Sequence, residues 1–102
     1  MSRDLQIAQS ECYEGGDWWT WAVWIDGPER ELDAVERVEW VLHPTFPHPV
    51  RSVSDRANKF RLTSAGWGVF RIIATVHMKN GDRTKLSHPL ELSYPDGTLT
   101  TA

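Results

Sequence analysis

Two turns of this sequence carry side chains whose types and spacing suit the binding of a small polar group. The first turn, residues 42–49, reads LHPTFPHP, and the second, residues 66–70, reads GWGVF. Each places a large aromatic ring, Phe46 or Trp67, in a turn built from proline or glycine. A ring in such a turn has no strand face to belong to, so it can serve as one wall of a binding site.

Polar groups accompany both rings. His43 and Thr45 lie beside Phe46, and backbone amides flanked by Gly66 and Gly68 lie beside the second ring. Two rigid turns that each carry a ring and hydrogen-bonding groups can form a narrow slot for a flat, polar, uncharged group. The pair of turns therefore predicts a binding site, and it contains no catalytic set.

Signals for catalysis or metal binding are weak elsewhere in the sequence. The four histidines and Cys12 show no close pairing of ligand type, and His43 and His48 are separated by two prolines. No G-x-S-x-G motif, paired carboxylate motif or phosphate loop occurs. A small hydrolase that uses Cys12 or His43 is supported only by the presence of these residues. We expect a non-enzymatic binding module without a cofactor or metal.

Size and charge describe one ordinary soluble domain. The chain has 102 residues, of which 40% are hydrophobic and 25% charged, enough for a single two-layer core. The formal net charge is −3 and the basic residues are scattered. A nucleic-acid-binding surface needs clustered lysine and arginine, so we expect no nucleic-acid partner. The acidic balance suits a basic peptide partner.

The compartment can be predicted from the cysteine content and the hydropathy. The single Cys12 excludes an internal disulfide, which fits a reducing compartment. No window approaches the roughly 18 consecutive apolar residues of a membrane span, and the N-terminus lacks the apolar core of a signal peptide. We expect residues 1–102 to form a single cytoplasmic domain, which can belong to a larger multidomain protein.

Alternation of apolar residues with period two dominates the chain and predicts β-strands. The Asn80-Gly81 pair between two alternating runs is a strong hairpin signal. Six to eight short strands separated by turns are typical of an antiparallel sandwich. The expected inward rows are Trp19, Trp21, Val23 and Ile25; Val38, Trp40 and Leu42; Phe70, Ile72, Ala74, Val76 and Met78; with weaker rows at Leu5 and Ile7, at Phe60 and Leu62, and from Leu86 to Tyr94.

One segment contradicts the strand pattern. Residues 28–38, PERELDAVERV, combine helix-forming residues with a proline near a helix start and apolar residues three positions apart. Propensity alone predicts a helix here. The family resemblance described next places a loop and the start of a strand in this segment, so we expect at most one turn of helix before about Val35.

Four blocks of the sequence carry a family resemblance: WAVWIDGPE, VEWVLHPTFPHPVR, FRLTSAGWGVFRI and LSHPLEL. From about Trp21 to Leu92 the chain resembles the YEATS domain family, and more closely its prokaryotic branch. The LHPTFP and GWG blocks are specific in combination. The resemblance implies an all-β, immunoglobulin-like antiparallel sandwich of about seven to eight strands. It also implies recognition of an acylated lysine, of the acetyl or crotonyl type, or of a related flat amide.

The resemblance also implies a role for each matched residue. The Thr45 hydroxyl would bond the ligand amide, and the backbone amide of Trp67 would bond the acyl carbonyl. The rings of Trp67 and Phe46 would enclose the acyl group, and His43 would close one wall. Gly66 and Gly68 would keep the slot open.

Two positions depart from the family pattern. In the family, an aromatic residue of the first loop often completes the site. Here that loop reads EGGDWW, so Trp18 or Trp19 could serve. The position that matches the family's aromatic residue falls nearer Asp17. Eukaryotic members contact a histone tail partly through acidic residues near the last loop, where this chain has residues 87–89, SHP. A histone tail is therefore not supported as the partner.

Structural roles for the same residues remain as alternatives. Phe46 could be a loop plug beneath Pro44 and Pro47, Thr45 could cap the turn backbone, and His43 could bond the loop. On that interpretation the protein is an immunoglobulin-like protein–protein interaction module that does not recognise acyl-lysine. Trp21 and Trp40 are expected in the core, and Trp24 either beneath the LHPTFP loop or on an exposed sheet face.

Overall fold

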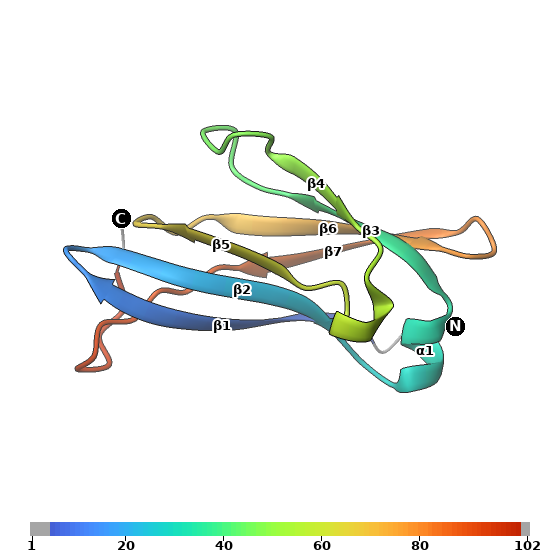
Figure 1. The fold of residues 1–102 in the computed structure, drawn as a ribbon, viewed down its shortest axis with the longest axis horizontal. Helices are drawn as coiled ribbons and strands as arrows, with labels where there is room; N and C mark the ends of the chain where they lie inside the picture. Colours follow the sequence, from blue (N-terminus) through green and yellow to red (C-terminus); the bar gives the residue numbers. More distant parts are fainter. Residues whose placement is uncertain (1–4, 101–102) are drawn as a thin grey trace.

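Two antiparallel sheets packed face to face form the molecule (Figure 1). The structure is a computed structural model, and it describes residues 5–100. The first sheet has the strand order β1–β2–β5 and the second β4–β3–β6–β7. The arrangement is the immunoglobulin-like β-sandwich that the sequence predicts. The strands are β1 (Gln6–Gly15), β2 (Trp18–Asp26), β3 (Val35–Val41), β4 (Val50–Val53), β5 (Leu62–Gly66), β6 (Arg71–Met78) and β7 (Arg83–Pro89).

The inward rows predicted from alternation form the core between the sheets. Trp19, Trp21, Val23 and Ile25 on β2 are all at most 2% exposed, and they face the buried rows of β3 and β6. The buried indoles of Trp19 and Trp40 donate hydrogen bonds to the carbonyls of Ser93 (2.8 Å) and Phe60 (2.9 Å). A buried tryptophan needs such a partner, so these two bonds fix the positions of the largest core side chains.

Two strands differ from the sequence-based expectation. β1 is ten residues long, whereas the alternation of Leu5 and Ile7 indicated only a short strand. β4 was missed altogether, because its four residues follow directly after the proline-rich turn and are only partly buried. The helix prediction is confirmed in its restricted form: α1 covers only Glu29–Asp33, and β3 begins at Val35.

The hairpin between β6 and β7 forms at Asn80-Gly81, as predicted. The Met78 amide donates to the Asp82 carbonyl (2.8 Å), and the Gly81 amide donates to the Met78 carbonyl (3.0 Å). Gly81 has a φ of 95°. The glycine occupies the left-handed position at the end of a loop of residues 79–81, rather than the second position of a two-residue turn.

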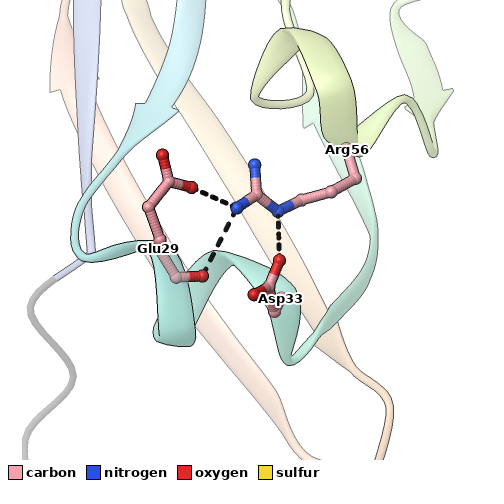
Figure 2. A network of polar contacts seen from close by, with 3 residues as sticks. All are labelled: Glu29, Asp33 and Arg56. Carbon is pink, nitrogen blue, oxygen red and sulfur yellow. Dashed lines mark hydrogen bonds and ion pairs between the residues drawn. The ribbon is translucent and has the colours of Figure 1, made fainter.

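Arg56 ties the two short helices together at the end of the sandwich where α1 lies (Figure 2). It belongs to the 3₁₀ helix η1 (Arg56–Asn58), and its Nε donates to the Asp33 carboxylate of α1 at 3.0 Å. Its Nη2 donates to the Glu29 carboxylate and to the Glu29 carbonyl (3.4 Å). The hydrogen bond with Glu29 is the main cause of the raised pKa of Arg56.

A polar network joins β1 to the chain around the end of β7. The Gln9 Nε2 donates to the Glu91 carbonyl (2.8 Å), and the Glu91 amide donates back to the Gln9 Oε1 (3.0 Å). His88 Nε2 lies 2.7 Å from the same Oε1. Because an amide oxygen can only accept, His88 must carry a proton on Nε2 and donate it. Burial is the main cause that lowers the pKa of His88 below its usual value.

This depressed pKa predicts a pH dependence of stability. The unfolded chain, with a histidine pKa near 6.5, binds a proton at a higher pH than folded His88 does. Stability therefore rises with pH and is lost as the pH falls through about 6.5. We expect the urea midpoint to fall between pH 7.5 and 5.5, and to fall less in His88→Gln. The control His48→Asn changes an exposed histidine with positive φ outside the Gln9 network, and a slope reduced as much as in His88→Gln would show that the effect is not specific to His88. Equal slopes for the parent and His88→Gln would contradict this assignment.

Candidate functional site

A cleft of about 460 Å³ lies where the β3–β4 loop approaches the β5–β6 turn. Figure 1 shows this loop and this turn at the end of the sandwich opposite α1, together with the β1–β2 turn. The volume falls in the range typical of sites for small molecules. Seven of the eight predicted site residues line the cleft. Its lining is Trp18, His43, Thr45, Phe46, Pro47, Ala65, Gly66, Trp67, Gly68, Val69 and Phe70.

Two backbone hydrogen bonds shape the β3–β4 loop. The Phe46 amide donates to the His43 carbonyl at 3.0 Å, which makes a β-turn with Pro44 at its second position, where the fixed φ of proline is favoured. The Leu42 amide donates to the Pro49 carbonyl at 2.7 Å and closes the loop at its base. The motif LHPTFPHP therefore encodes a short, closed loop that presents its side chains at defined positions.

Phe46 anchors this loop to the core and also lines the cleft. Its ring centroid lies 6.2 Å from that of Trp21 and 5.3 Å from that of Phe70, and Trp21 and Phe70 lie 6.0 Å apart. The guanidinium of Arg51 lies 5.9 Å from the Phe46 centroid and donates hydrogen bonds to the carbonyls of residues 47 and 48. Edge-to-face and tilted ring pairs of this geometry are favourable. The Phe46 ring therefore packs against the core and lines the cleft at the same time.

Phe70 lines the cleft, although the sequence pattern did not predict this. Alternation assigned it to the core row of the longest strand, but β6 begins one residue later, at Arg71. The Phe70 ring is only partly buried and lines the cleft beside Phe46. The assignment of Phe70 to the buried core row is thus corrected. Its place in the GWGVF block was the available signal.

His43 and Thr45 form a small hydrogen-bonded unit. The Thr45 amide donates to His43 Nδ1 at 3.3 Å, and the Thr45 Oγ1 lies 2.9 Å from the same nitrogen. Because Nδ1 accepts the amide hydrogen, it carries no proton, and the hydroxyl must donate to it as well. This arrangement turns the lone pairs of Thr45 Oγ1 away from His43, where they can accept a hydrogen bond from a ligand N–H group.

The β5–β6 turn supplies the opposite wall. Trp67 is 60% exposed, so its ring is not a core element, and it follows the last residue pair of the β2–β5 ladder, Trp19 with Gly66. A Cβ added at Gly66 would lie 3.8 Å from Phe46 Cζ. The folded chain therefore has room for a methyl group at Gly66, but that methyl would occupy space between the turn and the Phe46 ring.

Of the two first-loop candidates, the structure brings Trp18 to the cleft and buries Trp19. Successive residues of a strand point to opposite faces, and here Trp18 is 44% exposed whereas Trp19 is fully buried. The Trp19 ring packs between those of Tyr13 and Tyr94, with both centroid distances 5.0 Å. The prediction of Trp19 as a ligand contact is thus wrong.

Four further observations concern the chemistry of the described residues. The indole nitrogen of Trp21, beneath Phe46 and Phe70, has no hydrogen-bond partner among residues 5–100. Within the same range no three His, Cys, Asp or Glu side chains come together as metal ligands. Cys12 is exposed on β1. No helix in the described part of the chain is long and apolar enough to cross a membrane.

Because Trp67 is exposed and Trp19 is buried, we expect their substitution to change the free energy of unfolding by very different amounts. Trp67→Ala should change the free energy of unfolding by no more than about 0.5 kcal/mol, as surface substitutions usually do. Trp19→Ala should cost about 3–5 kcal/mol, because it leaves a cavity and an unpaired Ser93 carbonyl. Urea unfolding at 25 °C measures both. A Trp67→Ala variant destabilised as strongly as Trp19→Ala would show that the Trp67 ring is a packing element.

Comparison with known proteins places this geometry in a family context. Residues 19–91 match the sequence profile of the prokaryotic YEATS domain. Among curated relatives, the protein AF-9 homolog of Eremothecium gossypii is 37% identical over 68 residues, 65% of this chain and 32% of the relative. The Saccharomyces cerevisiae protein of the same name is 39% identical over 59 residues, 56% of this chain and 25% of the relative. The matched region thus spans a third or less of these relatives.

Solved structures show the same similarity over nearly the whole chain. The Yaf9 YEATS domain recognizing an H3K122suc peptide superposes with a TM-score of 0.73 at 27% identity, covering 96% of this chain and 77% of that one. The Yaf9 YEATS domain bound to H3K27ac superposes with a TM-score of 0.68 at 25% identity, covering 94% and 75%.

Proposed function

Because the chain belongs to the prokaryotic YEATS domain family, we propose that its cleft binds an acylated lysine side chain of a partner protein. The observation that carries this proposal is the arrangement of Thr45 beside the rings of Phe46 and Trp67 in one cleft of ligand size. Two structural neighbours are Yaf9 domains with H3K27ac and H3K122suc, which supports an acyl-lysine ligand for this cleft.

The chemistry of the cleft favours an amide over an amine. Acylation removes the positive charge of lysine and leaves one N–H donor and one carbonyl acceptor. A free ammonium buried in an aromatic slot would lose several kcal/mol of hydration. Cation–π attraction returns only about 0.5–2 kcal/mol. His43 is the only titratable side chain among the lining residues of the cleft, so no carboxylate there can pair with an ammonium.

Each polar group of an acyl-lysine has a counterpart in the proposed complex. The Thr45 Oγ1, whose hydrogen is directed to His43 Nδ1, accepts the ligand N–H. The main-chain amide of Trp67 donates to the acyl carbonyl. Phe46 and Trp67 enclose the planar acyl group, and each aromatic contact contributes roughly 0.5–1.5 kcal/mol beyond area burial. Gly66 keeps the approach to Phe46 open.

The partner is a protein with an accessible acylated lysine, and a histone tail is not required. Residues 87–89 occupy the end of β7, and His88 is committed to the Gln9 network, so this region offers no acidic contact for a basic tail. A docking module that uses a sheet face is the second candidate. The guanidinium carbon of Arg61 lies 4.8 Å from the ring centroid of Trp24 on β2. This pair favours the outer face of the first sheet for such docking.

Calorimetry with matched peptides tests the proposal. We expect crotonyl-lysine to bind at least as tightly as acetyl-lysine, because a conjugated group stays flat and meets rings on both faces. The unmodified peptide should bind near the detection limit. Equal affinity for the unmodified and acylated peptides would contradict the proposal and leave the docking module as the better interpretation.

A pair of Thr45 variants separates the hydrogen bond from the shape of the cleft. Thr45→Val keeps the volume but removes the acceptor, so a buried ligand N–H loses its partner, at about 1–3 kcal/mol, or at least fivefold in Kd. Thr45→Ser keeps the hydroxyl and should stay close to the parent. Parent-like binding by Thr45→Val would show that Thr45 does not contact the ligand amide.

A further inference from the structure

A second cavity, of about 300 Å³, adjoins the cleft. Trp18 and Trp67 line both cavities, so these two exposed indoles form the boundary between them. The remaining residues come from the β1–β2 turn and from the segment after β7. The lining of the second cavity is Gly16, Asp17, Trp18, Trp67, Tyr94 and Thr100.

The second cavity differs from the cleft in its charge. Asp17 is the one acidic residue of its lining, and no basic residue lines it. Two hydrogen bonds hold Asp17 in place. The Tyr94 hydroxyl donates to the carboxylate oxygen Asp17 Oδ1 at 2.8 Å, and the main-chain amide of Asp17 donates to the Tyr13 hydroxyl at 3.2 Å. The hydrogen bond with Asp17 is the main cause of the raised pKa of Tyr94, so this hydroxyl keeps the proton that it donates to Asp17.

The backbone at Asp17 adds to this constraint. Its φ is 56°, and Gly15 and Gly16 before it also have positive φ. A non-glycine residue in the left-handed region is uncommon, with aspartate and asparagine the best tolerated. The turn thus places a carboxylate at a defined point directly before Trp18, one of the two residues that line both cavities.

We propose that the second cavity receives the distal end of the acyl group and that Asp17 makes the site select against acyl groups that end in a carboxylate. This inference rests on the proposed function of the cleft. An acyl chain whose amide lies at Thr45 and Trp67 extends between the indoles of Trp18 and Trp67 toward Asp17. Uncharged ends are accepted there, whereas a succinyl or malonyl carboxylate meets a fixed like charge. On this proposal the chain would not share the recognition of a succinylated peptide that the Yaf9 domain with H3K122suc shows.

Butyryl-lysine and succinyl-lysine in one peptide sequence form the matched probe, because the two acyl groups have nearly the same length and differ in the terminal charge. Two unit charges about 4 Å apart in water interact by an amount equivalent to about fivefold in Kd. We therefore expect calorimetry at low salt to give the parent a Kd for succinyl at least about fivefold weaker than for butyryl. The ratio should shrink in 0.5 M salt, because screening acts on exposed charges.

Asp17→Asn tests the residue itself. Asparagine tolerates positive φ and keeps an oxygen for the Tyr94 hydroxyl, so the substitution removes the charge alone. The butyryl-to-succinyl discrimination should fall toward one. The control Asp26→Asn removes an equal charge nine residues further along the chain, at the other end of β2, about 26 Å from Trp18 at 3.3 Å per residue, and should keep the parent's ratio.

The outcomes separate this inference from the function on which it rests. Tight butyryl binding with equal succinyl binding in the parent would overturn the role of Asp17 and leave acyl-lysine recognition intact. Unchanged discrimination in Asp17→Asn, or discrimination insensitive to salt in the parent, would overturn it as well. Failure of the parent to bind any acylated peptide would overturn both proposals.

Discussion

Phe46 packs its ring against Trp21 and Phe70, with centroids 6.2 and 5.3 Å away, and so ties an otherwise exposed loop to the core. The neighbouring loop residues His43, Pro44 and Thr45 are all exposed, and of these His43 also contacts the ring cluster, with its centroid 6.2 Å from that of Phe70. The position of the Thr45 hydroxyl, which is bonded to His43, therefore depends on how Phe46 and His43 pack against this cluster. The same contact makes one face of the cleft, so the loop cannot be anchored without also forming the site. Trp21, at the base of this cluster, is itself a β2 core residue, which links the cleft directly to the packing between the sheets.

The walls of the site are built from turns, and their charges differ between the two cavities. The cleft contains aromatic rings, a hydroxyl and backbone, and it suits an uncharged planar group. The adjoining cavity contains a carboxylate held by Tyr94. With this division, the cleft would select for an uncharged amide, and the adjoining cavity would discriminate between acyl groups by the charge at their far end. The segment after β7 helps to form the adjoining cavity, because Tyr94 packs on Trp19 and bonds Asp17.

Alternation predicted the strands that lie between two layers and failed where burial is incomplete. The rows of β2, β3 and β6 were found because every second residue is apolar and fully buried. β4 was missed because both of its faces are partly exposed. Phe70 was placed in the core because it continues the period of β6, although the chain leaves the sheet at that residue. Whether Trp18 or Trp19 faces the cleft depends on where the turn before them ends and the strand begins. That turn has three residues with positive φ, Gly15 to Asp17, and the alternation of apolar residues does not reveal its length.

The six tryptophans allow a direct test of where a ligand binds, since each indole N–H gives its own signal in a nitrogen–proton correlation spectrum. Addition of an acetyl-lysine peptide should shift the indole signals of Trp18 and Trp67. The signals of Trp19 and Trp40, bonded to the carbonyls of Ser93 and Phe60, should stay in place, and so should that of Trp24 on the sheet face. The unmodified peptide should shift none of them. Shifts centred on Trp24 with Trp18 and Trp67 unchanged, or equal shifts with the unmodified peptide, would contradict recognition of acyl-lysine in the cleft.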